Sequence, residues 1–132
     1  MAAALIFSAS ASAYDVPSTI FERDGKFSPP RLAAFVASVE PSIREWPARF
    51  RNERHESEVR LATSRVVKEI NAVDLSGIRD QAVLTNGAHT LSMAHNIDLG
   101  SGPKAKETFE LAIALNPESR RTNYLFGITT VR

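Results

Sequence analysis

Residues 104–127, KAKETFELAIALNPESRRTNYLFG, carry the most informative pattern in the chain. Ala105, Phe109 and Ala112 recur at helical spacing, which places two small residues and one large aromatic side chain on one helix face. The small residues let a second helix approach closely, and the phenylalanine fills the groove between the two helices. Pro117 cannot continue the helix and turns the chain back. The stretch therefore predicts a helix that ends before Pro117 and packs tightly against a neighbour.

The same residues resemble the second helix of a tetratricopeptide (TPR) repeat. In that family a small residue is followed by Phe, then Ala, then Pro, and Ala105, Phe109, Ala112 and Pro117 match the spacing throughout. The aromatic-rich segment 123–127, NYLFG, follows where the next repeat should begin. The resemblance implies an all-α fold of antiparallel helical hairpins, a fragment of a TPR-like right-handed solenoid whose units bury their faces against neighbours.

This TPR-like region spans residues 77–132 and comprises one divergent repeat and the start of another. A helix over residues 78–96 stands where the first helix of the repeat belongs, and Gly87 is its candidate small contact. Gly127 stands where the following helix needs a flat contact point. The connection between the first and second helices is longer than the family norm. The alternative is an unrelated helical hairpin that shares the same Ala, Phe and Pro residues.

The N-terminal helices are expected in residues 29–76, after an irregular lead-in over residues 14–28. Ser28 followed by Pro29 is a favourable helix start. Apolar residues at helical spacing follow, namely Leu32, Phe35, Val36 and Val39. Pro41 ends or kinks this helix. Trp46 is expected to pack within the N-terminal helical region.

A second N-terminal helix is expected from Asn52, a good cap, to about Val73. Its apolar positions share one face: Val59, Ala62, Val66, Val67, Ile70 and Val73. The run from Arg44 to Arg60 holds five arginines and four glutamates. A phosphate-binding patch is one interpretation of this run, but the acids neutralise it, which favours a solvated helix face.

Composition excludes several function classes. The chain has 132 residues, enough for one domain, and a net charge of +1, which gives no reason to expect nucleic-acid binding. Cysteine is absent, so thiolate nucleophiles, iron–sulfur clusters and disulfides are excluded. The Gly-rich segment 100–104 is too short for a phosphate loop. We expect no cofactor and no metal.

The N-terminus carries the signal for localisation. Residues 1–13 are predicted to be a signal peptide, because an uncharged apolar stretch ends in the small-x-small sequence 11–13, ASA, before Tyr14. No Lys or Arg precedes the stretch, so either the signal is weak or the true start lies upstream. A disordered Ala/Ser tail is the alternative. The stretch is too short to span a bilayer, which takes about 20 apolar residues. A periplasmic or secreted protein is expected.

Repeats of this family bind peptides or helices through the first helix of each repeat. Carried onto this chain, the resemblance implies a partner-binding set of Leu84, Ala88, Leu91, Arg121, Tyr124 and Ile128. Such an apolar lining suits either a hydrophobic ligand or burial against another helix. The resulting expectation is a non-catalytic protein–protein interaction module, a scaffold or adaptor of the bacterial cell envelope, whose partner is a protein or peptide.

Two further possibilities concern chemistry and the chain end. The alternative function is a small envelope hydrolase or metal-dependent enzyme using His89, His95 and Asp98, although histidines six apart point to different sides of a helix. His95, near a helix end, is better explained as a capping residue. The chain ends at Arg132, before the next repeat could be completed. Residues 123–132 are therefore expected to be frayed or covered by a second molecule, with self-association through this apolar helix.

Overall fold

The computed structural model describes residues 16–130, and over this range the protein is all-helical. Its elements follow in the order α2 (Pro29–Ile43), α3 (Glu53–Ala72), the short 3-10 turn η1 (Leu75–Gly77), α4 (Gln81–His95), α5 (Gly102–Leu115) and α6 (Arg120–Thr130). Strands are absent from the described range, where Phe21 and Phe27 form one isolated antiparallel bridge in the lead-in. The predicted all-α class is confirmed. The expected signal peptide, residues 1–13, lies outside the described residues.

Short polar side chains fix where the helices begin. The Ser28 hydroxyl accepts a hydrogen bond from the Arg31 backbone, and the Asn52 side chain accepts one from the His55 backbone at 2.8 Å. Both residues were the predicted caps. Asp80 and Ser101 cap α4 and α5 in the same way. Each cap satisfies a backbone N–H that has no partner within its own helix.

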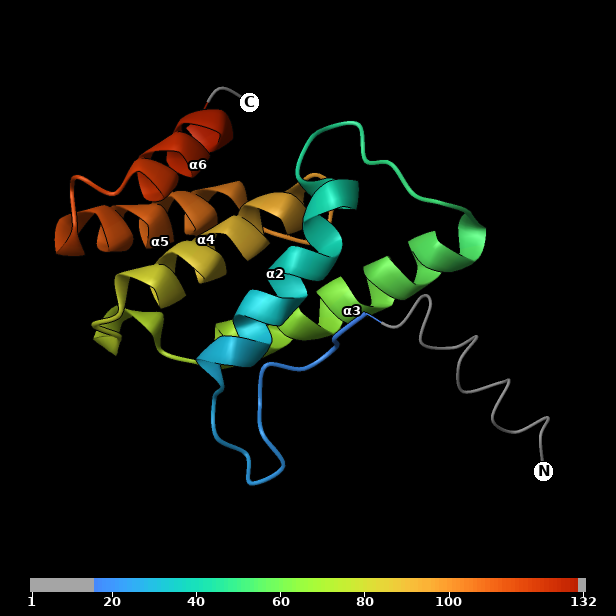
Figure 1. Ribbon diagram of the computed structural model, residues 1–132, viewed down its shortest axis with the longest axis horizontal. Helices are drawn as coiled ribbons and strands as arrows, with labels where there is room; N and C mark the ends of the chain where they lie inside the picture. Colours follow the sequence, from blue (N-terminus) through green and yellow to red (C-terminus); the bar gives the residue numbers. More distant parts are fainter. Residues whose placement is uncertain (1–15, 131–132) are drawn as a thin grey trace.

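Helix α4 lies at the centre of the molecule. It packs against α2, α3, α5 and α6, and Figure 1 shows α5 running alongside it with α6 crossing above. From Val83 to Ala94 every residue of α4 is buried except Asn86, which is half-buried. A helix that is apolar on nearly all sides must be covered on all sides, which explains the four neighbours.

The apolar side chains form two clusters of unequal size. The larger joins α2, α3 and α4 with the inner face of α5, and its fully buried members include Phe35, Val59 and Leu84. The smaller joins α4, α5 and α6 through Ala88, Phe109, Leu125 and the half-buried Phe126 and Ile128. The apolar contacts of α6 therefore come from the smaller cluster.

The predicted tight contact of α5 is confirmed. Ala105, Phe109 and Ala112 are all fully buried, and α5 packs most extensively against α4. The Phe109 ring also lies 5.7 Å, centroid to centroid, from Phe126 of α6. The pattern of small, aromatic and small residues thus identified the packed face correctly.

Three expectations about the packing of residues outside α5 are wrong. Trp46 is 72% exposed, because the α2–α3 connection that carries it leads away from the helices (Figure 1). Gly127 makes no close contact, since a Cβ added there would meet nothing within 4 Å. Helix α6 turns Thr122 and Leu125 inward instead. Gly87 was expected to be the small contact for the second helix of the repeat. A Cβ added at Gly87 would instead lie 3.2 Å from Cδ1 of Leu75 in η1, so the close neighbour of Gly87 is η1 and not α5.

The turn between α4 and α5 is more constrained than its Gly-rich sequence indicates. A Cβ added at Gly100 would lie 2.5 Å from the Leu91 carbonyl oxygen and 2.9 Å from the His95 backbone nitrogen. Asp98 has a φ of 62°, in the left-handed region. Only glycine fits at position 100, because the turn rests directly on the α4 backbone.

Helix length and apolarity bear on membrane insertion. Within residues 16–130 no helix is both long enough and apolar enough to cross a membrane.

Candidate functional site

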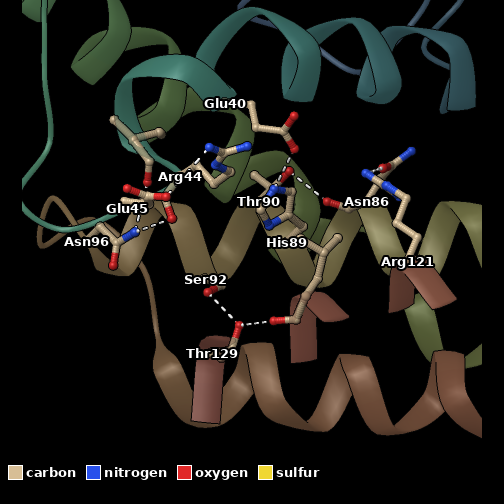
Figure 2. A network of polar contacts seen from close by, with 12 residues as sticks. Glu40, Arg44, Glu45, Asn86, His89, Thr90, Ser92, Asn96, Arg121 and Thr129 are labelled. Carbon is tan, nitrogen blue, oxygen red and sulfur yellow. Dashed lines mark hydrogen bonds and ion pairs between the residues drawn. The ribbon is translucent and has the colours of Figure 1, made fainter. Parts of the chain in front are cut away.

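The polar cluster with the most buried titratable group lies where α2 crosses α4. His89 of α4 is 2% exposed, and its Nε2 lies 2.8 Å from Oε2 of Glu40 on α2 (Figure 2). The Glu40 side chain is 33% exposed, so the carboxylate reaches solvent while the imidazole does not. An ionised carboxylate can only accept hydrogen bonds, so His89 donates through Nε2.

Burial lowers the pKa of His89 below the ordinary value of histidine, because desolvation disfavours the charged ring. The hydrogen bond and the negative charge of Glu40 oppose this shift, and the positive charges of Arg121 and Arg44 reinforce it. Since desolvation is the largest of these effects, the ring is neutral at physiological pH. The Glu40–His89 contact is therefore a hydrogen bond from a neutral ring to a carboxylate.

Polar side chains also join α4 to α6. Thr85 and Thr122 hydroxyls lie 2.8 Å apart, and the Ser92 hydroxyl lies 2.9 Å from that of Thr129. Arg121 of α6 donates through Nη2 to Oδ1 of Asn86 at 2.9 Å (Figure 2). This row of contacts holds α6 at one orientation, because each bond has a fixed donor and acceptor geometry.

The end of α2 is attached to α4 by a side chain as well. Nδ2 of Asn96 donates to the backbone oxygens of Ile43, at 2.8 Å, and Arg44, at 3.3 Å. These are carbonyls of the last turn of α2, which lack partners within their own helix. The polar residues of α4 thus hold α2 on one side and α6 on the other.

The His89 ring forms a contact between two helices. In the part of the chain that the structure describes, the hydrogen bond of His89 goes to Glu40. A histidine and a carboxylate in this setting connect two helices.

The residues of the alternative enzyme hypothesis are not brought together. His89 is buried against Glu40, whereas His95 and Asp98 are exposed at the end of α4 and in the turn after it. His95 borders Gly102, the first residue of α5. Across residues 16–130 no group of three His, Asp or Glu side chains could hold a metal ion.

The structure divides the predicted partner-binding set in two. Leu84, Ala88 and Leu91 are at most 1% exposed, so their assignment to a binding surface is wrong. Neighbouring helices cover the α4 face that carries these three residues. Burial against another helix was the alternative expectation for them.

The second half of the set, on α6, is accessible. Tyr124 is 64% exposed, Arg121 is exposed and Ile128 is half-buried. Spacings of three and four place these residues on one side of the helix. Arg121 also bonds to Asn86 of α4 and Ile128 packs against the smaller cluster, so these two lie at its border and Tyr124 carries its exposed apolar area. We call Arg121, Tyr124 and Ile128 the α6 outer face.

Sequence reasoning missed other exposed apolar side chains, namely Trp46, Leu61, Leu111 and Leu115. For Trp46 a signal was present, since Pro41 and Pro47 surround it and prolines disfavour a continuous helix. For Leu111 and Leu115 the signal was weaker. Both leucines lie beside the buried face of α5 at helical spacing. Whether they are exposed depends on how far the neighbouring helices extend over that side of α5.

Comparison with known proteins adds no relative. No family model matches the chain, and searches of curated proteins and of solved structures give no match. Function must therefore be argued from the residues themselves.

Proposed function

We propose that this protein is a non-catalytic protein–protein interaction module of the bacterial cell envelope, with a TPR-like scaffold. The observation that carries the proposal is the α6 outer face, where Tyr124 is 64% exposed and Ile128 lies beside it. Tyrosine and arginine are enriched where proteins bind one another, because each offers a large contact area with a polar end. Helix α6 presents both types on one side.

The TPR-like assignment is supported by the packing of the last three helices. Helices α4 and α5 form a close hairpin around Ala105 and Ala112, and α6 contacts both of them. Phe109 fills the space between α4 and α6, beside Ala88 and Leu125. In a TPR-like array the first helix of the next repeat contacts both helices of the preceding one, and α6 has these contacts.

The envelope assignment rests on the N-terminal sequence. An uncharged apolar stretch followed by the 11–13 sequence ASA has the form of an export signal. The composition is compatible with that compartment, because a chain without cysteine is unaffected by the oxidising conditions there.

Site-specific photo-crosslinking in the bacterium tests the proposal. A photoreactive residue placed at Tyr124 should capture a discrete partner protein from the envelope, since this side chain lies in the proposed contact. The same residue at Ala34 serves as the control, because it is exposed on α2, away from the α6 outer face. A captured dimer of the chain itself would assign the face to self-association. Absence of any product at Tyr124, or the same products at both positions, contradicts the proposal.

A further inference from the structure

The connection between α2 and α3, residues 44–52, displays a tryptophan. Trp46 is 72% exposed, more than any other large apolar side chain in the described range. Tryptophan normally hides most of its surface, because it has the largest apolar area of any side chain. Figure 1 shows the connection arching away from the helices. Trp46 is therefore presented to solvent and takes no part in the core.

The beginning of this connection is fixed to the body of the protein. The Asn96 side chain holds the Ile43 carbonyl at 2.8 Å, and the Arg49 backbone N–H donates to the Ser42 carbonyl at 2.8 Å. The second bond closes the chain around Trp46 into a loop. The indole thus projects from a segment whose two arms are hydrogen-bonded to each other.

The end of the connection is fixed as well. The Phe50 ring meets His55 edge-on at 6.0 Å, and the Arg60 guanidinium lies 6.0 Å above the same ring. The Arg51 backbone N–H donates to Nδ1 of His55 at 3.2 Å. A surface held in place before binding loses less conformational entropy when a partner arrives.

The charged run of residues 44–60 divides at the start of α3. Within the helix the acids face arginines one turn away, in the pairs Arg54–Glu58 and Arg60–Glu56. Within residues 44–51 three arginines accompany one acid, so this part carries a net charge of +2. The net positive charge of the mixed run therefore lies in the connection, whereas residues 53–60 hold three glutamates and two arginines and carry a net charge of −1.

A hollow of about 200 Å³ lies in the same connection. Its walls are Pro41, Ser42, Arg44, Glu45, Pro47 and Arg49. Arg44 and Arg49 thus line a small hollow together with Glu45 and Pro47, the residues on either side of Trp46, and Arg44 pairs with Glu45 at 3.6 Å. Arginine binds carboxylates through two parallel hydrogen bonds, and tryptophan and arginine dominate the energetics of protein interfaces.

We propose that Trp46 and this hollow form the docking site for an acidic segment of a partner protein. An apolar side chain of the segment lies on the indole, and a neighbouring carboxylate enters the hollow at Arg49. The inference rests on the proposed function and adds a contact surface to it. A membrane surface fits less well, because one indole and a net charge of +2 form a weak anchor. Nucleic acid fits less well, because a net charge of +2 on one short segment would neutralise few phosphates.

Fluorescence tests this docking site directly, because Trp46 is the only tryptophan in the chain. Titration of the full chain with a short synthetic peptide of alternating glutamate and leucine should shift the Trp46 emission to the blue and saturate. Arg49→Glu should weaken the affinity about tenfold or more, since the carboxylate would face a like charge. Arg65→Glu makes the same charge change at an exposed position of α3 and should leave the affinity within about twofold.

Three results overturn the docking site. They are no shift with the acidic peptide, equal affinity in Arg49→Glu and wild type, and an equal shift with vesicles of anionic phospholipid. Circular dichroism of each variant checks that it is folded. If the peptide fails while crosslinking at Tyr124 captures a partner, the docking site is wrong and the proposed function stands. If crosslinking fails while the peptide binds as described, the α6 outer face is wrong and the docking site stands.

Discussion

His89 links the stability of the protein to pH through its hydrogen bond with Glu40. Burial lowers the pKa of the folded-state imidazole, so the unfolded chain binds more protons in mild acid. Stability is then complete above about pH 6.5, the ordinary pKa of histidine, and falls as the pH decreases towards the folded-state pKa. Urea unfolding across this window should show the decline. His89→Gln should flatten it, whereas His95→Gln should not, because His95 is exposed. Equal slopes for wild type and His89→Gln would refute the account of this pair.

Phe109 anchors the smaller apolar cluster, in which it contacts Ala88, Leu125 and Phe126. Replacing it with alanine leaves a cavity between three helices. Phe109→Ala should therefore lower the free energy of unfolding by about 3–5 kcal/mol, measured by urea denaturation. Glu110→Ala, one residue on and exposed, should change it by no more than about 0.5 kcal/mol. Comparable values for the two variants would mean that α5 is not packed as described.

Among the structural elements, the turn between α4 and α5 depends on one glycine, Gly100. Gly100→Ala brings a methyl group against the Leu91 carbonyl, and backbone atoms there cannot move aside. We expect a loss of about 1–3 kcal/mol in unfolding free energy, the usual cost of overpacking. Gly77→Ala is the matched control, because nothing lies within 4 Å of its added Cβ. Thermal melts that rank the two variants in the opposite order would contradict this geometry.

Helices α4 and α6 should differ in local stability. Helix α4 is buried on nearly all sides, whereas α6 is held by the smaller cluster and a row of polar contacts. Local opening is easiest where few apolar contacts must break. Amide hydrogen exchange should therefore be slowest in α4 and fastest, among the described helices, in α6. Similar protection of Leu91 and Leu125 would show that α6 is as firmly held as the core.

Local signals in the sequence predicted most of the elements. Ser28 and Asn52 were identified as caps because capping depends on one short side chain and the next few backbone groups. The spacing of Ala105, Phe109 and Ala112 identified the buried face of α5, because helical periodicity is a local property. Pro41 was expected to end or kink the first helix, and α2 includes it and ends two residues later, at Ile43.

The candidate site depends on contacts between distant residues, and these were not predictable. Glu40 and His89 are 49 residues apart in sequence, and no local pattern reveals their pairing. The burial of Leu84 and Leu91 depends on which helices cover α4. The exposure of Trp46 depends on the path of the α2–α3 connection after Pro47. Each of these is decided by tertiary packing, which overrides local preference.

At the scale of the whole molecule, the structure separates a stabilising interior from two accessible surfaces. The polar side chains of α4 hold α2 and α6 in place, and the larger cluster holds α2, α3 and α4 together. Tyr124 on the α6 outer face and Trp46 in the α2–α3 connection are large side chains exposed to water. Our proposals assign both of these surfaces to partner binding.

Quantitative affinity purification from the cell envelope tests this central claim most directly. Wild-type protein, Tyr124→Ser and the control Glu110→Ala would be tagged, expressed at equal levels and compared by mass spectrometry. The account predicts at least one envelope protein that wild type and Glu110→Ala enrich and that Tyr124→Ser loses, since the tyrosine ring is the largest exposed side chain of α6. Identical protein profiles for all three forms would contradict it.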